Sequence, residues 1–248
     1  FFWNGGCKIM VKIGNFLFRY RNALFPLVFV LLFLEGTWPV CDSKLAERWE
    51  IVLGIIVALS GQILRALTIG LAYIKRGGKK KQVYAGKLVQ NGIFAHCRNP
   101  LYLGNLLILL GVGIAANSLP FVLFGIPFFL FAYLAIIHAE ENYLGKKFGQ
   151  EFKDYCERVN RIIPNFSGIG NTIKGMEFNW KRLIVKEYAT PFVWITGLTF
   201  LIIKDTYLDY GYEASKYTLW SLSILFLVAT CAFFTAWYLK KGKFLRLN

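Results

Sequence analysis

The sequence predicts an all-α integral membrane protein with about six transmembrane helices. Of its 248 residues, 56% are hydrophobic and 17% are aromatic, and the apolar residues gather in runs close to the roughly 20 residues that cross a bilayer. Basic residues lie between these runs. The net charge of +15 would indicate nucleic-acid binding only if it formed a basic face on a soluble fold. A nucleic-acid partner is therefore not expected.

The apolar runs, taken in order, define the expected helices. Asn117-Ser118-Leu119-Pro120 joins the third and fourth runs and predicts a tight helical hairpin. The polar stretch 139–188 interrupts the pattern, and its part 140–160 is expected to form a helix along the cytosolic membrane surface. The six expected spans are residues 23–40, 49–74, 100–116, 118–138, 189–203 and 217–239.

The distribution of basic residues sets the expected orientation. If the N-terminus faces the cytosol, 24 of the 29 Lys and Arg residues lie on the cytosolic side and four on the other, with Arg65 inside the second span. Because cytosolic loops are enriched in Lys and Arg, we expect both termini and the loops 75–99 and 139–188 to face the cytosol. The run Arg76–Lys81 is expected to be a turn attracted to anionic membrane lipids.

The cysteines follow no metal-binding or disulfide pattern. They form no CxxC pair and have no cluster of histidines nearby, so the spacing typical of zinc and iron–sulfur sites is missing. Only Cys41 is expected near the outer face, so no intramolecular disulfide is expected. The five thiols, expected to be small buried or interfacial groups, are Cys7, Cys41, Cys97, Cys156 and Cys231.

Two segments carry the chemical signal. The first comprises residues 88–94 (LVQNGIF) followed by 98–104 (RNPLYLG). The second, residues 140–164, begins with Glu140-Glu141 and continues through an aromatic and basic pattern to Pro164. Together they resemble the paired signatures of the isoprenylcysteine carboxyl methyltransferase and phospholipid methyltransferase superfamily, and the resemblance covers about residues 49–164.

The resemblance implies a membrane methyltransferase that uses S-adenosylmethionine and takes a lipid-like or isoprenoid-type acceptor from the bilayer. Methyl transfer from a sulfonium needs no metal and depends chiefly on positioning. The cofactor is expected in a cytosol-facing pocket. The residues that the resemblance assigns to the cofactor are Lys87, Leu88, Val89, Gly92, Phe94, Arg98, Asn99, Pro100, Tyr102, Leu103 and Glu140.

The chemistry of several of these residues is compatible with that role. A carboxylate at Glu140 can pair with cationic groups of the cofactor, and Pro100 at a helix start leaves backbone amides free. Gly92 allows close backbone approach. Tyr102 and Phe94 offer aromatic faces to an adenine, although aromatic residues are also ordinary at membrane interfaces.

Three further residues, His138, Glu141 and Arg65, are candidate catalytic groups. His138 lies three residues before Glu141 on the same helix face, and as a general base it would suit an amine or hydroxyl acceptor. An interfacial histidine is the alternative. An arginine within a membrane span is a functional candidate, and snorkelling of Arg65 toward the membrane surface is the alternative.

Two departures from the family pattern bear on the acceptor. Asn99 stands where the family usually has a histidine, and it keeps hydrogen bonding without a titratable group. Ile136 stands where the prenylcysteine enzymes carry an arginine for the substrate carboxylate. We therefore expect a lipid with an amine, hydroxyl or thiol nucleophile rather than a prenylcysteine carboxylate.

The same sequence leaves two other readings open. A nicotinamide-dependent sterol-type reductase shares a related start to the third span, but Glu140-Glu141 argues against it. A non-catalytic relative could serve as a subunit of a membrane complex. The expected division is an N-terminal segment with the first span (1–48), a methyltransferase-like core (49–164), and a linker with an additional helix pair (165–248). That pair could shape a lipid entrance or dock a partner.

Overall fold

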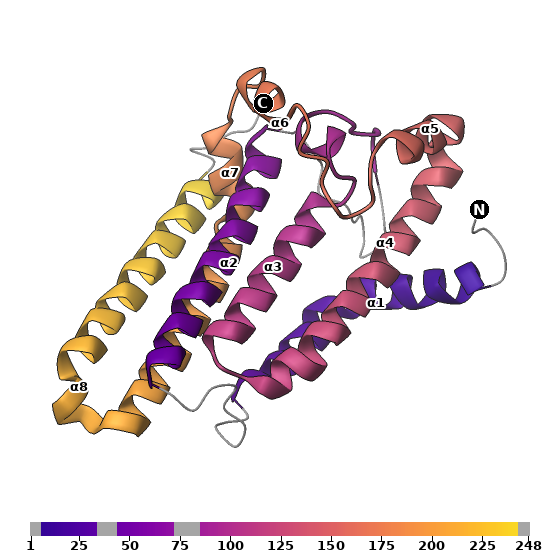
Figure 1. Cartoon of the computed structure of the whole chain (residues 1–248). Coiled ribbons are helices and arrows are strands. Elements are labelled where there is room, and N and C mark those ends of the chain that lie inside the picture. The colour runs from indigo at the N-terminus through magenta and orange to yellow at the C-terminus, as the bar shows by residue number, and fades with distance from the viewer. Residues whose placement is uncertain (1–5, 34–43, 72–84, 243–248) are drawn as a thin grey trace.

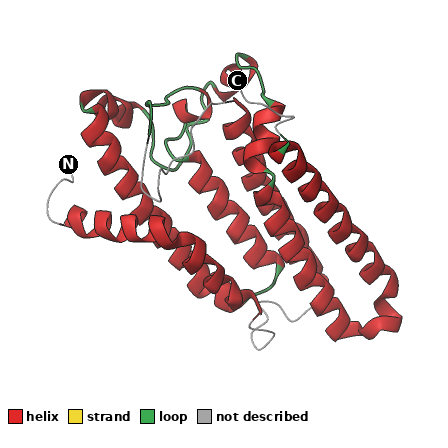
Figure 2. Cartoon of the chain, turned by 180° about the vertical axis from the view of Figure 1, so that it is seen from behind, coloured by secondary structure: helices red, strands yellow, loops and turns green. Residues whose placement is uncertain are grey.

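The chain is a bundle of helices, and the computed structural model describes residues 6–33, 44–71 and 85–242. These residues contain helices and no strand (Figures 1 and 2), which confirms the all-α prediction. Cys41 and the Arg76–Lys81 run lie outside the described residues. The helices are α1 Gly6–Phe29, α2 Lys44–Leu71, α3 Pro100–Ala115, α4 Ile126–Phe148, α5 Gln150–Arg158, α6 Ile169–Lys174, α7 Trp180–Glu187 and α8 Ala189–Lys241.

α1 packs against α4 through aromatic rings. Phe25 of α1 meets Phe129 and Tyr133 of α4 edge-on, with ring centroids 5.1 and 5.7 Å apart, an arrangement that aromatic pairs prefer. The helix begins at Gly6, well before the expected start of the first span at residue 23, and continues as a 3-10 turn over Val30–Phe33. The remainder of that expected span lies outside the described residues.

α2 and α3 lie side by side along their length (Figure 1) because glycines face one another across the contact. Gly54 and Gly61 of α2 are one heptad apart, as are Gly104 and Gly111 of α3. A Cβ atom added to Gly61 would lie 2.5 Å from the Gly104 carbonyl oxygen, closer than real Cβ atoms come. Small residues of this kind let helix backbones approach closely in a membrane. We call this contact the glycine seam.

The turn between α3 and α4 is tight, as its sequence predicts. Asn117 takes a left-handed conformation with φ of 44°, which asparagine tolerates better than most residues. The Ser118 hydroxyl donates to the Leu31 carbonyl oxygen, 3.0 Å away in the turn after α1. A π-helical turn at Phe121–Gly125 then leads into α4. The α3–α4 hairpin is thereby tied to the end of α1.

The surface helix expected at 140–160 begins later than predicted. α4 continues without a break through Phe148, so Glu140 and Glu141 belong to the long helix. Gly149 then turns the chain with φ of 56°, a conformation that glycine adopts without steric cost, and α5 follows as a separate short helix. The two glutamates are therefore held by a helix anchored in the bundle.

α8 is a helical hairpin. Its 53 residues would extend about 80 Å if straight, more than twice the roughly 30 Å of membrane hydrocarbon. Gly211 interrupts the helix with φ of 66°, and the two arms run back along each other (Figure 1), with Phe233 and Phe192 stacked at 4.3 Å between ring centroids. The two arms contain the expected fifth and sixth spans.

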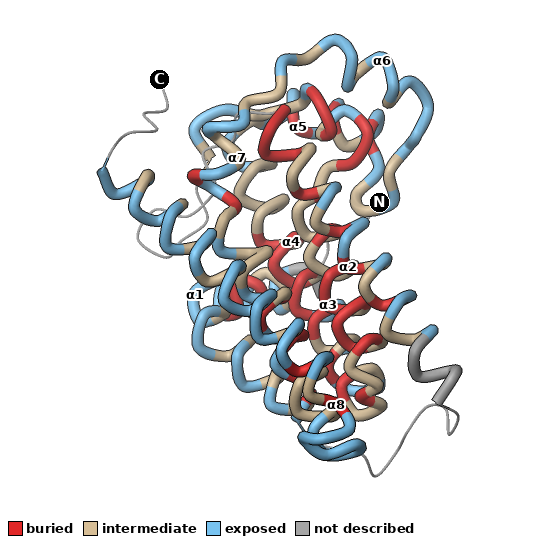
Figure 3. The backbone as a smooth tube through the Cα atoms, turned by 90° about the vertical axis from the view of Figure 1, so that its left-hand side faces the viewer, coloured by how far each residue is buried: buried red, intermediate tan, exposed pale blue. Residues whose placement is uncertain are grey.

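Four helical stretches are long and apolar enough to cross a membrane, namely Lys8–Phe33, Trp49–Leu71, Phe121–Phe148 and Ala189–Lys241, and α3 is a shorter apolar helix. Buried positions concentrate on α3 and α4, whereas much of α8 is exposed (Figure 3). Exposed side chains of α8 include Leu227 and Phe234, whose apolar character suits contact with lipid. The number of spans and the cytosolic side of the termini and motif loops stay predictions.

Candidate functional site

Two loops distant in the sequence, residues 85–99 and 159–166, meet over the N-terminal end of α3, and we call them the cap (Figure 1). The Asn99 side-chain amide donates to the Arg161 carbonyl oxygen at 2.9 Å. The backbone amide of Arg98 also donates into the second loop. Both halves of the sequence signature therefore contribute to one surface above α3.

His96 joins the cap to α6 from the inside. It is buried, and its Nδ1 lies 2.8 Å from the Asn165 carbonyl oxygen while its Nε2 lies 2.8 Å from the Thr172 hydroxyl. Because a carbonyl oxygen can only accept, Nδ1 donates, and in the neutral ring Nε2 accepts from Thr172. The sequence analysis missed His96, although its place within the first signature segment was a signal.

The interior of the cap is buried. The Cys97 thiol is buried and donates to the Ile162 carbonyl oxygen at 3.0 Å, and burial raises the pKa of this thiol to about 11. Tyr155 of α5 donates its hydroxyl to the Phe94 carbonyl oxygen at 2.7 Å, and burial raises its pKa too. α5 and the cap thus form one packed unit over α3.

Glu141 ties this unit to α4 through two ion pairs. Its carboxylate oxygens lie 2.7 Å from Arg161 Nη2 and 3.2 Å from Arg98 Nη2. Both oxygens are engaged by guanidinium groups, a strong form of hydrogen bonding. The position of Glu141 therefore favours a structural role, and the catalytic role expected from the sequence stays a prediction.

A cavity of about 630 Å³ lies beneath the cap, and we call it the polar cavity. Its volume is typical of small-molecule sites. Of the residues selected from the sequence, it brings together Arg65, Phe94, Arg98, Asn99, Pro100, Tyr102 and Glu140. The other lining residues are Phe18, Arg21, Asn22, Phe25, Pro26, Phe29, Leu101, Asn105, Tyr133 and Thr190.

The charged groups of the polar cavity suit a ligand that carries both signs. Tyr102 donates its hydroxyl to Glu140 Oε1 at 2.7 Å, which orients the carboxylate. The Nε–H of Arg98 is buried and has no hydrogen-bond partner among the described residues. A buried donor without a partner is costly, so a ligand acceptor would relieve that cost. A zwitterionic amino acid group would place its ammonium at Glu140 and its carboxylate at Arg98.

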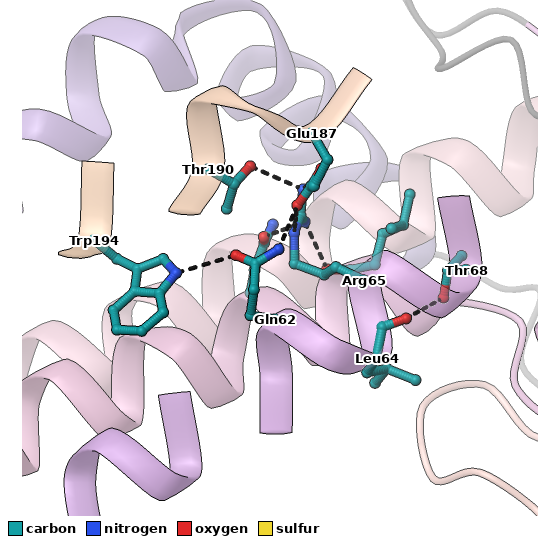
Figure 4. Close-up of polar contacts among 9 residues, drawn as sticks. Gln62, Leu64, Arg65, Thr68, Glu187, Thr190 and Trp194 are labelled. Atoms are coloured by element: carbon teal, nitrogen blue, oxygen red, sulfur yellow. Dashed lines mark hydrogen bonds and ion pairs between the residues drawn. The ribbon is translucent and has the colours of Figure 1, made fainter. Parts of the chain in front are cut away.

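A buried polar network forms another part of the wall (Figure 4). Arg65 of α2 makes a bidentate pair with Glu187 of α7, with Nε–Oε1 at 2.5 Å and Nη2–Oε2 at 2.9 Å. It also donates to Asn105 of α3 at 2.5 Å and to Thr190 of α8 at 3.2 Å. The guanidinium therefore does not snorkel toward the membrane surface, and it links four helices around the cavity.

Gln62 extends this network to α8. Its amide donates to Glu187 Oε1 at 3.3 Å and accepts from the Trp194 indole Nε1–H at 3.0 Å (Figure 4). A buried indole is usually satisfied by such a partner. The orientation of Trp194 in α8 is therefore set by α2.

A second cavity of about 620 Å³, which we call the apolar cavity, adjoins the first among α1, α3 and α8. It shares seven lining residues with the polar cavity, namely Asn22, Phe25, Pro26, Phe29, Asn105, Tyr133 and Thr190. The other residues that line it are Leu32, Phe33, Ile108, Leu109, Val112, Ala189, Val193, Trp194, Gly197, Leu198 and Leu201. The two cavities are adjoining compartments of one site.

Seven residues selected from the sequence lie outside both cavities, namely Lys87, Leu88, Val89, Gly92, Leu103, His138 and Glu141. Lys87 is exposed, and Leu88 packs against Phe152 and Tyr155. His138 bonds through Nδ1 to the Leu134 carbonyl oxygen one turn earlier at 2.8 Å. Most of the first signature segment thus builds the cap, and the functional assignments of these residues stay predictions.

The sequence analysis missed the contributions of α1 and α8. Motif-based reasoning could not select α1 because the signature begins at residue 88. One signal was available, because Asn22 and Asn105 are polar residues within apolar helices, and polar groups at membrane depth mark functional positions.

The helical fold, the cap and the zwitterion-compatible cavity are compatible with the membrane methyltransferases that the two signature segments resemble. A sequence profile of the phospholipid methyltransferase family matches residues 49–151. The chain belongs to the superfamily of phospholipid and isoprenylcysteine membrane methyltransferases. The resemblance inferred from the two signature segments is thereby confirmed.

The chain is similar to three proteins over most of its length. It is 32% identical to the cobalt-zinc-cadmium resistance protein CzcN of Cupriavidus metallidurans, over 84% of this chain and 92% of that protein. It is 30% identical to the nickel-cobalt-cadmium resistance protein NccN of Alcaligenes xylosoxydans xylosoxydans, over 62% of this chain and 70% of that protein. Identity to protein-S-isoprenylcysteine O-methyltransferase B of Arabidopsis thaliana is 26%, over 62% and 79%. No solved structure matches the chain significantly.

Proposed function

We propose that this protein transfers a methyl group from S-adenosylmethionine to a lipid-like or isoprenoid-type acceptor in the membrane. The observation that carries the proposal is the convergence of Glu140 and the unpartnered Nε–H of Arg98 on the polar cavity. Both residues belong to the segment that matches the family profile. The cofactor is an amino acid sulfonium, so its ammonium and carboxylate match these two groups.

The residues of the polar cavity would hold the cofactor in a defined way. Glu140, oriented by Tyr102, would accept hydrogen bonds from the ammonium, and Arg98 would donate to the carboxylate. Phe94 at the edge of the cap offers a ring for the adenine. The bound cofactor would supply an activated methyl group. The buried cap above would exclude water from it, so that the transfer is reserved for the acceptor.

Positioning is the main contribution required of the protein, since methyl transfer depends on aligning nucleophile, methyl and leaving group. Of the candidate catalytic residues, Arg65 lines the polar cavity, but its donors are engaged by Glu187, Asn105 and Thr190. We assign it a positioning role. Glu140 also lines the cavity, and we assign it to the cofactor ammonium rather than to proton transfer from the acceptor.

We propose a neutral nucleophile, an amine, hydroxyl or thiol, for the acceptor. Ile136, which occupies the position of the family's carboxylate-binding arginine, is completely buried in the core, so this position offers no cation to the site. A prenylcysteine carboxylate would lack that partner and would carry a desolvation cost of several kcal/mol. Labelled cofactor, incubated in parallel with membrane lipid extract and with a farnesylated cysteine, distinguishes the two. Base-labile methyl esters on the farnesylated cysteine alone would contradict this choice.

Calorimetry with S-adenosylhomocysteine on the detergent-purified protein tests the proposal as a whole. We expect binding to the wild type, weakened by Glu140→Gln. Val228→Leu, on the exposed lipid-facing second arm of α8, serves as a matched control with unchanged binding. Heat and thermal stabilisation with a reduced nicotinamide cofactor would favour the sterol-type reductase instead. No response to either cofactor would favour the non-catalytic subunit, for which the C-terminal helices would offer the partner surface.

The printed names of two relatives concern resistance to cobalt, zinc, cadmium and nickel, and we propose that the methyl transfer of this chain serves metal tolerance. Expression in a metal-sensitive bacterial host, with Glu140→Gln as the inactive control, tests whether the methyl transfer contributes to metal tolerance. Protection by the wild type and not by the variant is expected. Equal protection by both would separate metal tolerance from the methyl transfer.

A further inference from the structure

We infer that the apolar cavity binds the hydrocarbon chain of the acceptor and that α8 forms one wall of this chain-binding site. The inference rests on the proposed function for the identity of the acceptor. α8 lies outside residues 49–151, the segment matched by the family profile. Membership of the family therefore does not assign this wall to any ligand.

The two cavities meet where a reacting head group would have to lie. The side chains at their junction include Asn22, Asn105, Tyr133 and Thr190, all neutral and all capable of hydrogen bonding. Arg65 holds Asn105 and Thr190 by hydrogen bonds of 2.5 and 3.2 Å. A neutral head group placed there would face the polar cavity, and its hydrocarbon chain would extend into the apolar cavity.

The wall contributed by α8 is ordered and apolar. Leu198 and Leu201 are buried, at 4% and 2% exposure, and the Trp194 indole is fixed by Gln62 at 3.0 Å. Burial of a hydrocarbon against such a surface is favourable because it removes apolar area from water. A polar ligand would find few partners beyond the junction, so the chemistry of the cavity selects a hydrocarbon.

The mouth of the apolar cavity opens toward the surface of the bundle. Phe33, at the end of the turn after α1, is 44% exposed, and Val193 of α8 is 61% exposed. Both residues line the cavity. Since the outer surfaces of these helices are apolar enough to face lipid, a membrane-dissolved acceptor can enter between α1 and α8 without crossing water.

Substitutions of Gly197 can test this inference. Gly197 lines the apolar cavity, and a Cβ atom added there would meet nothing within 4 Å. A larger side chain at this position therefore enters open space without displacing the backbone of another helix, and because Gly197 lines the cavity, we expect the side chain to narrow it. Gly170, in α6, also has open space around an added Cβ atom but lies outside both cavities, so Gly170→Leu is the matched control.

The experiment uses the full chain in phosphatidylcholine nanodiscs and hexadecanol that carries a photoreactive diazirine near the end of its chain. Cross-linked peptides are mapped by mass spectrometry in the wild type, Gly197→Ala, Gly197→Leu and Gly170→Leu. We expect labelling of the segment 193–201 in the wild type, a slight decrease in Gly197→Ala and at least a five-fold decrease in Gly197→Leu. Labelling of the residues shared by the two cavities by an octanol analogue, whose chain is half as long, should persist in all four proteins.

S-adenosylhomocysteine binding is measured on the same samples and is expected to be equal in all of them. The two measurements distinguish the two proposals. A wild type that does not bind S-adenosylhomocysteine would contradict the proposed function, whereas the labelling pattern tests the chain-binding site independently. Unchanged labelling of 193–201 in Gly197→Leu, or labelling spread evenly over the outer face of α8, would overturn the inference. Thermal unfolding of each variant verifies that the protein is folded.

Discussion

α3 contacts α2 on one side and α8 on the other, and the two contacts differ in kind. Against α2, glycines bring the backbones so close that a single added Cβ atom would collide with a carbonyl group. On the α8 side, α3 is not packed as closely, and large side chains of α8 such as Trp194 and Leu198 line the apolar cavity. The glycine seam fixes the start of α3 under the cap, and the α8 side leaves room for a ligand.

The difference teaches how one bundle can be rigid and open at once. Interfaces built on small residues gain many short contacts and tolerate little change. Interfaces that enclose a cavity forgo some of these contacts. The buried ion pair of Arg65 and Glu187 connects the two kinds of interface, since Arg65 belongs to α2, which forms the glycine seam, and Glu187 ends α7, directly before α8.

The largest effect is expected at the glycine seam. Gly61→Leu forces a side chain into the Gly104 carbonyl group and the Ile108 backbone nitrogen. Because neither backbone can yield, the cost should exceed the roughly 1–3 kcal/mol usual for overpacking and abolish the folded state. We expect little monodisperse protein by size-exclusion chromatography. Gly197→Leu, the same substitution on the open side of α3, is the control and should remain folded. Equal tolerance of both variants would break the comparison.

The next largest effect is expected from removal of the ion pair between Arg65 and Glu187. Arg65→Met leaves the Glu187 carboxylate buried without its bidentate partner, and breaking a buried pair in this way costs about 3–5 kcal/mol. Gln62 and the remaining bundle contacts should keep part of the population folded. Because an apolar pair can replace buried charges, Arg65→Met combined with Glu187→Leu should recover most of the thermal stability.

The double variant also separates structure from positioning. If Arg65 serves only to neutralise Glu187, methyl transfer should return together with stability. If it positions Asn105 and Thr190, as we propose, stability should return while KM for the acceptor stays raised. A full return of the acceptor KM would contradict the positioning role.

A smaller effect is expected in the polar cavity. Glu140→Gln keeps the hydrogen bond from Tyr102 but removes the charge, and charge-assisted bonds are about twice as strong as neutral ones. We expect about ten-fold weaker binding of S-adenosylhomocysteine by calorimetry, with an unchanged unfolding midpoint. Tyr102→Phe, which only loosens the carboxylate, should weaken binding less. A larger loss of binding in Tyr102→Phe than in Glu140→Gln would indicate that the cofactor does not bind at Glu140.

The smallest effect concerns the cap. The folded pKa of Cys97 is raised from 9.0 to about 11 by burial, so above pH 9 the unfolded chain releases this proton while the folded chain retains it. The contribution to stability is therefore fully present below pH 9 and declines between pH 9 and about 11. The unfolding midpoint of the wild type should fall more between pH 8 and pH 10 than that of Cys97→Ala. Parallel decreases would show that the cap is open to water.

The sequence was sufficient for the fold class, for the α3–α4 hairpin and for the core of the site, because those features are local. Apolar runs and the Pro100 helix start are set by neighbouring residues, and the two signature segments specify Arg98, Tyr102 and Glu140 directly. The late start of the surface helix could not be predicted, because it depends on Gly149 adopting a positive φ that the sequence permits at several other glycines.

The remaining parts of the site depend on contacts over long distances in the sequence. Arg65 could be selected because an arginine within an apolar helix is unusual. Its partner Glu187 is 122 residues away, and the local sequence around either residue does not indicate the pairing. The walls from α1 and α8 follow from how those helices pack, which periodicity does not determine. For His138, the sequence spacing from Glu141 is favourable, whereas the structure shows its Nδ1 bonded to the Leu134 carbonyl oxygen, and its catalytic role stays a prediction.

The pairing of Arg65 with Glu187 also sets the order in which the protein can mature at the ribosome. α2 emerges with an arginine in its apolar length, and the carboxylate that neutralises it is synthesised 122 residues later, a delay of roughly ten seconds at typical elongation rates. Until then this helix must be sheltered by the insertion machinery or by water at the edge of the bilayer. The nascent bundle is therefore completed from its C-terminal side, when α7 delivers Glu187 to a helix made long before.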